Sequence, residues 1–225
     1  YRVPLALDRT FLDHRITYPH FLRPHFVFRD YALDVFTIDA QIATPKDIAW
    51  WNKPIFWGKF MIGIDAVLRK IALFPGWEKR FSFDERILST GPDTYLVGFW
   101  QSEKYFIDIA DTLRKDFILK EPLLEATQIL LKEIQEEDAL CVHVRRSDIA
   151  SKSFHGACDR AYYMRGIEYI VKKDRIGKIY VFSDDIKWCE ENLRFDFPTM
   201  YVSMEHSGKH GEGHLALMSA CKHFI

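Results

Sequence analysis

The chain has 225 residues, of which 48% are hydrophobic and 15% aromatic, and its 31 basic side chains nearly balance 32 acidic ones. This composition excludes a disordered chain, because so many aromatic residues require a packed core. The formal net charge of -1 excludes the broad basic surface of a duplex-binding protein, so we expect no nucleic-acid partner. The sequence also contains no run of about 18 apolar residues that would predict a membrane-spanning helix.

The first part of the chain, up to about Asp138, is rich in aromatic residues and irregular in pattern. Apolar residues recur at helical spacing in three segments, which predicts helices at 58–73, 102–117 and 122–136. Ser102 is a plausible cap for the second helix, and Pro122 suits the first turn of the third. Carboxylates are unfavourable at a helix C-terminus, so the acidic run 136–138 predicts a solvated turn.

After Asp138 strands and helices alternate. Short apolar runs predict buried strands, and amphipathic segments predict helices between them. The predicted strands are 139–144, 178–182 and 199–202, and the predicted helices are 160–173, 186–193 and 214–222. Asp159 is the expected cap of the first of these helices, whose buried face carries Tyr163, Ile167 and Ile170. Such alternation predicts a parallel α/β sheet, which binds ligands beyond the carboxyl ends of its strands.

The four cysteines form no close pair along the sequence. Their spacing argues against a zinc site, and their largely apolar neighbours predict buried thiols in a reducing compartment. They are Cys141, Cys158, Cys189 and Cys221.

The strongest group of polar residues runs off the carboxyl end of the strand at 139–144. It reads His-Val-Arg-Arg-Ser-Asp over residues 143–148. The planar guanidinium of arginine binds two phosphate oxygens at once, so Arg145 and Arg146 can hold a pyrophosphate without a metal and stabilise a leaving group. A surface Arg–Asp ion pair beside a core His143 explains the motif equally well.

A second group, Ser183, Asp184 and Asp185, follows the strand at 178–182. Acidic side chains there can bind ribose hydroxyls, a base edge or a cation. A cap on the helix that follows is the favoured interpretation of this motif alone. With no Asp-x-Asp between a strand and a turn, we expect neither a metal bridging a nucleotide diphosphate nor any other bound cofactor.

Residues 98–106, Gly-Phe-Trp-Gln-Ser-Glu-Lys-Tyr-Phe, mix aromatic rings with amide and charged groups. This mixture suits a sugar, whose apolar face stacks on a ring while its hydroxyls take hydrogen bonds. A helix start capped by Ser102 and packed by Trp100 explains the same residues, and the pattern does not separate the two.

Three histidines recur at spacing four near the end of the chain, at 206, 210 and 214. On a helix they would form one face of metal ligands. Glycines at 208, 211 and 213 argue against a helix before His214, so a loop is the favoured interpretation.

Taken in chain order, these segments resemble the bacterial alpha-1,2-fucosyltransferases, glycosyltransferase family 11. Residues 98–106 look like the family's G-Y-W-Q-S-E-K-Y-F segment, and residues 142–148 look like its H-x-R-R-x-D motif. Further matching segments follow in the family's order, at 29–36, 155–158, 162–163, 180–189 and 217–223.

The resemblance implies an α/β, GT-B-like fold with two Rossmann-like domains. Residues 1–138 would form the acceptor-side domain, and residues 139–225 would form the GDP-fucose-binding domain, each incomplete at its outer end. The implied reaction is an inverting, metal-independent transfer of fucose from GDP-fucose to the 2-hydroxyl of a terminal galactoside. A related enzyme of other linkage or donor, and a non-catalytic glycan- or nucleotide-binding module, are the alternatives.

The resemblance also implies partners and a location. The partners would be the nucleotide-sugar donor and a galactose-containing glycan acceptor. Bacterial members imply a cytoplasmic location, with peripheral contact at the inner face of the membrane.

The matching motifs imply roles for individual residues. Arg145 would neutralise the leaving diphosphate, His143 would contact the nucleotide, and Arg146 would support the loop or a phosphate. Asp148 is the candidate general base or orienting group for the acceptor hydroxyl. The remaining candidates are Ser183, Asp184 and Asp185 for the donor cleft, and Trp100 and Gln101 for the acceptor or cleft.

Two family segments have no counterpart in the sequence: a Gly-rich G-G-L-G-N-Q start and an N-S-x-F-S-W-W segment after the last helix. Residue 1 is Tyr rather than Met, and the chain stops at Ile225 within an apolar run. We therefore expect a fragment that lacks part of the donor cleft and is inactive alone. Ser147 replaces a frequent glycine, and His214 takes the place of an acidic residue common in the family.

Overall fold

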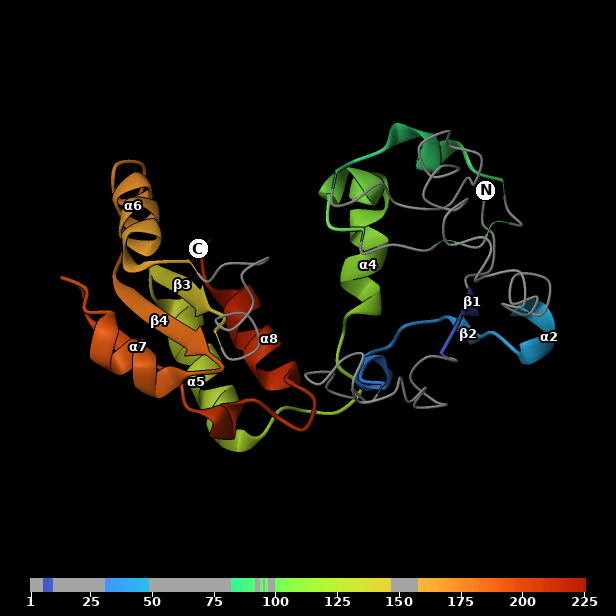
Figure 1. Ribbon diagram of the computed structural model, residues 1–225. Helices are drawn as coiled ribbons and strands as arrows, with labels where there is room; N and C mark the ends of the chain where they lie inside the picture. The colour runs from blue at the N-terminus through green and yellow to red at the C-terminus, as the bar shows by residue number, and fades with distance from the viewer. Residues whose placement is uncertain are drawn as a thin grey trace, which may run out of the picture. The chain divides into compact units, whose positions relative to one another are not determined.

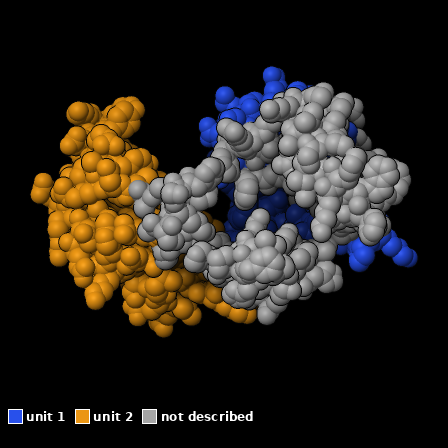
Figure 2. All heavy atoms as spheres, in the orientation of Figure 1, with its two compact units in different colours: residues 1–120 blue, residues 121–225 orange. Residues whose placement is uncertain are grey.

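The computed structural model describes residues 6–9, 31–48, 82–91, 94, 96, 100–146 and 158–225. The predicted helix at 58–73 lies outside these residues. The chain divides into two compact units, residues 1–120 and 121–225 (Figures 1 and 2). Among the helices described, none has the length and apolar character needed to cross a lipid bilayer.

The first unit contains short elements. Strands β1 (Ala6–Leu7) and β2 (Gln41–Ile42) pair in parallel. The helical elements are η1 (Leu33–Val35), α2 (Pro45–Ile48), η2 (Glu85–Ser89), η3 (Glu103–Tyr105), η4 (Ile107–Ile109) and α4 (Ala110–Asp116).

The helix predicted at 102–117 is confirmed as an α-helix only in its last part, α4. Before α4 the chain forms the two 3₁₀ turns η3 and η4, separated by Phe106 at φ -140°. Ser102 precedes η3 but makes no capping hydrogen bond with its side chain. Without that acceptor for the first backbone N–H groups, short 3₁₀ turns replace the first α-helical turns.

The second unit is a parallel α/β structure. Its strands are β3 (Ala139–Val144), β4 (Lys178–Ser183), β5 (Thr199–Tyr201) and β6 (His223–Phe224). Its helices are α5 (Glu125–Glu136), α6 (Arg160–Val171), α7 (Ile186–Asn192), η5 (Met204–His206) and α8 (Glu212–Ala220). All strands are parallel, in the order β5-β4-β3-β6.

This unit confirms the predicted alternation of strands and helices. Strand β3 has the predicted bounds, and β4, β5, α6 and α7 differ from prediction by one or two residues at their ends. The Asp159 carboxylate accepts the Tyr162 backbone N–H at 2.8 Å, as expected of the cap of α6. Helix α5 begins at Glu125 rather than at Pro122, and residues 137–138 form the predicted turn.

The sheet is buried on both faces, which explains the continuous apolar runs of β3 and β4. Alternate residues of β3, such as Leu140 and Val142, pack with α6 and α7. The residues between them, such as Ala139 and Cys141, pack with Leu217 of α8 and with α5. Figure 1 shows the same arrangement, with α6 and α7 on one side of the sheet and α5 and α8 on the other.

The mixed α/β class with a parallel sheet is confirmed by this unit. The GT-B arrangement of two Rossmann-like domains stays a prediction. So do the acceptor and donor roles of residues 1–138 and 139–225. Helix α5 packs against the sheet and α8, within the unit that begins at residue 121.

The expectation of four buried thiols is only partly right. All four cysteines are free, and Cys141 and Cys189 are buried, but Cys221 is half-buried and Cys158 is exposed. Cys158 stands directly before Asp159, the cap at the solvent-facing start of α6. A hydrogen bond with Cys221, together with burial, raises the pKa of the Cys141 thiol far above its ordinary value.

The loop after η5 and the first turn of α8 depend on glycines, and among them Gly211 has φ +91°. Gly208 has φ +76°, and a Cβ there would also lie 2.5 Å from the Glu212 carboxyl group. At the buried Gly213 a Cβ would lie 2.0 Å from the backbone oxygen of His206. A backbone atom cannot move aside as a flexible side chain can, so the loop and the start of α8 depend on this close approach.

Gly213→Ala should therefore destabilise the second unit by more than about 2 kcal/mol, through overlap with the His206 carbonyl. Gly177→Ala is the matched control, because its Cβ would meet only ordinary contacts at 3.5 Å or more. Urea unfolding followed by circular dichroism measures both variants. Equal stabilities of the two variants would contradict the packing of this loop.

Candidate functional site

The two polar motifs meet at one edge of the sheet. Strands β3 and β4 pair in register up to Val144 opposite Ser183. The residues that follow each strand therefore leave the sheet at the same level, and the Arg146 backbone N–H donates to Asp184 Oδ1 at 2.8 Å. The structure thus brings together His143, Arg145, Arg146, Ser183, Asp184 and Asp185, all predicted from sequence.

His143 lies on the α8 side of the sheet, where alternation along β3 places it with Cys141. Partial burial is the largest cause that lowers the pKa of its imidazole, and the charges of Arg145 and His214 lower it further. The Asp184 carboxylate acts in the opposite direction. The lowered pKa favours the neutral imidazole at pH 7, which offers one hydrogen-bond donor and one acceptor.

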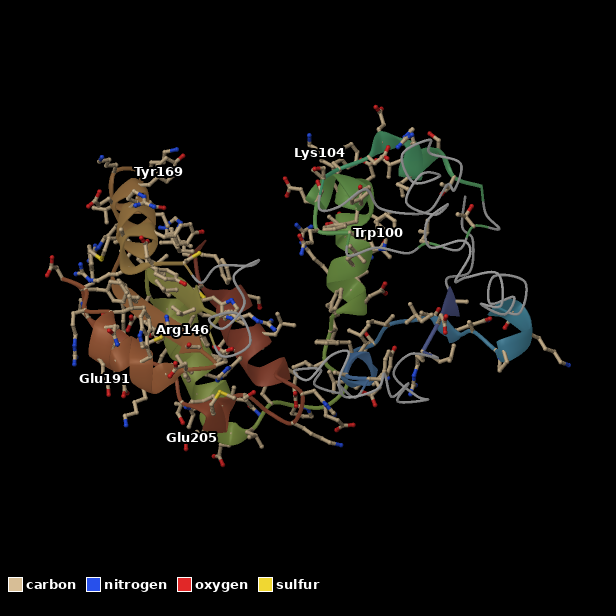
Figure 3. All side chains as sticks on the ribbon, viewed as in Figure 1. Trp100, Lys104, Arg146, Tyr169, Glu191 and Glu205 are labelled. Atoms are coloured by element: carbon tan, nitrogen blue, oxygen red, sulfur yellow. The ribbon has the colours of Figure 1, made fainter. Side chains whose placement is uncertain are left out.

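Arg145 and Arg146 have different surroundings. Arg145 is exposed, and its charge is close enough to His143 to affect the histidine's pKa. The Arg146 side chain is only 21% exposed, and its Cζ lies 3.6 Å from the ring centroid of Trp188 in α7. Figure 3 shows Arg146 beside the ends of β3 and β4. Arg145 is thus the more exposed of the two arginines at this edge.

The acidic residues after β4 mainly make contacts that hold neighbouring segments of the chain in place. Asp185 Oδ1 accepts the Trp188 backbone N–H at 3.2 Å and caps α7, which confirms the favoured interpretation of this motif. Asp185 Oδ2 also forms an ion pair with Arg146 Nε at 3.5 Å. Ser183 Oγ accepts the Asp185 N–H at 2.9 Å and is buried.

The ion-pair interpretation of the arginine motif is therefore right for Arg146. The acid that pairs with Arg146 is Asp185, on the turn between β4 and α7. His143 is exposed rather than a core residue, so that part of the alternative is wrong. Asp148, the candidate base, lies outside the described residues.

Two of the three histidines near the C-terminus, His206 and His214, have separate side-chain partners. His206 Nδ1 lies 3.3 Å from Thr127 Oγ1, and His214 Nε2 lies 3.0 Å from the Ser203 carbonyl oxygen. In the part of the chain that the structure describes, no group of three or more His, Cys, Asp or Glu side chains could hold a metal ion. The predicted loop is confirmed from Ser207 to Gly211.

Helix α8 begins two residues earlier than predicted because Glu212 organises its start. Its carboxylate accepts the backbone N–H groups of Lys209 at 3.0 Å and His210 at 2.7 Å. Burial raises the pKa of Glu212, but these two bonds and one from its own N–H outweigh it and lower the pKa overall. This role of Glu212 was not predicted, although an acidic residue in the first turn is a common helix-start signal.

Trp100 and Gln101 belong to the first unit (Figure 3). Trp100 has φ +48°, and its ring packs edge-on against Tyr105 of η3 at 5.3 Å. The Tyr105 hydroxyl accepts the Asp84 backbone N–H at 2.8 Å. The structural interpretation is confirmed for Trp100, which packs the start of a helical segment, but is wrong for Ser102, whose side chain makes no capping hydrogen bond. The sugar-binding interpretation stays a prediction.

The sequence pattern of glycosyl transferase family 11 matches residues 80–225. The chain belongs to glycosyl transferase family 11. In this family 11 chain, the matched residues include all of the four-stranded sheet and both polar motifs at its edge. No solved structure matches the chain.

Curated relatives of this family 11 chain carry transferase names. An alpha-1,2-colitosyltransferase of Escherichia coli is 32% identical over 134 residues, which are 58% of this chain and 46% of the relative. A galactoside 2-alpha-L-fucosyltransferase of Caenorhabditis elegans is 36% identical over 99 residues, 42% of this chain and 27% of the relative. Galactoside alpha-(1,2)-fucosyltransferase 1 of Mus musculus is 28% identical over 149 residues, 60% of this chain and 38% of the relative. The matched part of this chain spans less than half the length of each.

The electrostatics of the sheet edge can be tested on His143 by NMR titration of its imidazole protons. We expect a pKa below the ordinary value of about 6.5. Arg145→Gln should raise this pKa by removing a nearby positive charge, and Asp184→Asn should lower it further by removing a negative one. Asn keeps an oxygen that can accept the Arg146 N–H, so the substitution preserves that contact. A wild-type pKa at or above the ordinary value would contradict this description.

Proposed function

We propose that the protein transfers fucose from GDP-fucose to the 2-hydroxyl of a terminal galactoside, with inversion and without a metal. The observation that carries the proposal is the exposed Arg145 at the edge where β3 and β4 end, in a chain of this family. Relatives named as alpha-1,2-fucosyltransferases support the transferred sugar and the linkage.

The proposed reaction is an in-line displacement at the anomeric carbon of fucose. The bond from this carbon to the phosphate oxygen breaks, and GDP leaves with the electron pair. The galactoside oxygen forms the new bond and gives its proton to a base on the opposite face, for which Asp148 is the candidate. Arg145 stabilises the negative charge that develops on the leaving diphosphate.

The other residues at this edge bind and orient the donor in this proposal. Neutral His143 contacts a hydroxyl or the base, because it presents a donor and an acceptor without a charge. Ser183, Asp184 and Asp185 line the donor side and hold the loop after β3 through Arg146. Trp100 and Gln101 are proposed for the acceptor side.

A second donor deserves a direct test because the Escherichia coli relative is named as a colitosyltransferase. Colitose is fucose without the 3-hydroxyl, so a site that hydrogen-bonds this hydroxyl discriminates strongly between the two sugars. We propose fucose as the transferred sugar, and GDP-colitose is the competitor in the assay. For the acceptor we propose a galactose-containing glycan, used in the cytoplasm at the membrane face.

Incubation of the full-length protein with GDP-fucose and a panel of galactosides should give an alpha-1,2-linked product, with or without chelator. Arg145→Ala should lower kcat by about 10²-fold or more, because charge on the leaving group loses its partner. Arg145→Lys, which keeps the charge but loses the planar fork, should retain part of the rate.

Three results would contradict the proposal. Transfer abolished by chelator would overturn metal independence. Efficient transfer from GDP-colitose but not GDP-fucose would change the donor. Glycan binding without turnover, unaffected by Arg145→Ala, would favour a non-catalytic binding module.

A further inference from the structure

Arg146 is anchored on both its main chain and its side chain. Its backbone N–H donates to Asp184, directly after β4, at 2.8 Å. Its guanidinium stacks on Trp188 at 3.6 Å and lies in ion-pair distance of Asp185, at 3.5 Å. The first residues after β3 are therefore tied to the turn after β4 and to the first helical turn of α7.

The charges of the two arginines act on residues that belong to opposite faces of the sheet. The Arg146 charge acts on Tyr163 of α6, which belongs to the core cluster shared with α7. The Arg145 charge acts on His143, together with His214 of α8. Alternation along the extended chain after β3 explains this division, because successive side chains point to opposite faces.

The surroundings of Arg146 also reduce its attraction for an anion. The Asp185 carboxylate lies 3.5 Å from Arg146 Nε and offsets part of its positive charge, and the Trp188 ring occupies one face of its guanidinium. A diphosphate that bound Arg146 would have to compete with both. Arg145 lies between Val144, held by the sheet, and the anchored Arg146, so its backbone is positioned from both sides.

We propose that Trp188 is a positioning residue for the donor. Through its stack on Arg146 it holds the first two residues after β3 so that Arg145, rather than Arg146, binds the diphosphate. The inference rests on the proposed function, because it takes a nucleoside diphosphate as the ligand. Its energetic basis is preorganisation: a guanidinium already held in place loses less conformational freedom when the anion binds.

The test compares the affinities of the protein for GDP and GMP by calorimetry, because GMP lacks the second phosphate. Wild-type protein should prefer GDP. Trp188→Leu should weaken GDP binding by about tenfold and GMP binding much less, so the preference largely disappears. Trp188→Phe keeps an aromatic face for Arg146 and should retain most of the preference. Arg146→Lys should behave like Trp188→Leu, since an ammonium lacks the planar stack.

A double-mutant cycle separates positioning from general destabilisation. If Trp188 acts through Arg145, Trp188→Leu should have no further effect on GDP affinity in an Arg145→Ala background. Urea unfolding shows whether each variant folds. If Trp188→Leu does not fold, the comparison of Trp188→Phe with Arg146→Lys replaces it as the test.

The outcomes separate a failure of the proposed function from a failure of this inference alone. A wild-type protein without preference for GDP over GMP would overturn the proposed function and this inference with it. The inference alone would be overturned if Trp188→Leu or Arg146→Lys kept the wild-type preference for GDP over GMP. It would also be overturned if the losses of GDP affinity from Trp188→Leu and Arg145→Ala simply added in the double mutant.

Discussion

The parallel pairing of β3 with β4 is the constraint on which the candidate site depends. The register runs from Ala139 opposite Lys178 to Val144 opposite Ser183, so both strands end at the same level. Polar side chains within a sheet that is buried on both faces would lose their hydration, which is unfavourable. They therefore collect where the apolar runs end, and this places the arginines beside the aspartates.

The same pairing explains how two neighbouring arginines acquire different environments. Arg146 follows the face of β3 that packs with α6 and α7, and there it stacks on Trp188. Arg145 stands on the side of His143 and α8, where it is exposed. The near-zero net charge of the chain gives no sign of this local concentration of positive charge.

Much of the second unit could be predicted from the sequence because its signals are local. Strand β3 is a continuous apolar run, and Asp159 and Asp185 stand directly before the helices that they cap. Strand β6 was not predicted, since its two residues form a strand only by pairing with β3. Tertiary pairing, and not local propensity, makes such a segment a strand.

The residues of the candidate site could be predicted from the sequence, but the contacts between them could not. The edge of the sheet and the two motifs followed from the strand pattern alone. The position of Trp188 in the first turn after Asp185 was visible, but its stack on Arg146 exists only once β3 and β4 are paired. The irregular start at η3 and η4 was not visible in the sequence for a similar reason, because the Tyr105 hydroxyl accepts the backbone N–H of Asp84, which is distant in the sequence.

The most direct test of this account is a crystal structure of the protein with GDP bound. The account predicts the terminal phosphate against the Arg145 guanidinium at the carboxyl edge of β3, with Arg146 still stacked on Trp188. A diphosphate bound by Arg146 with that stack broken, or GDP bound away from this edge, would contradict it.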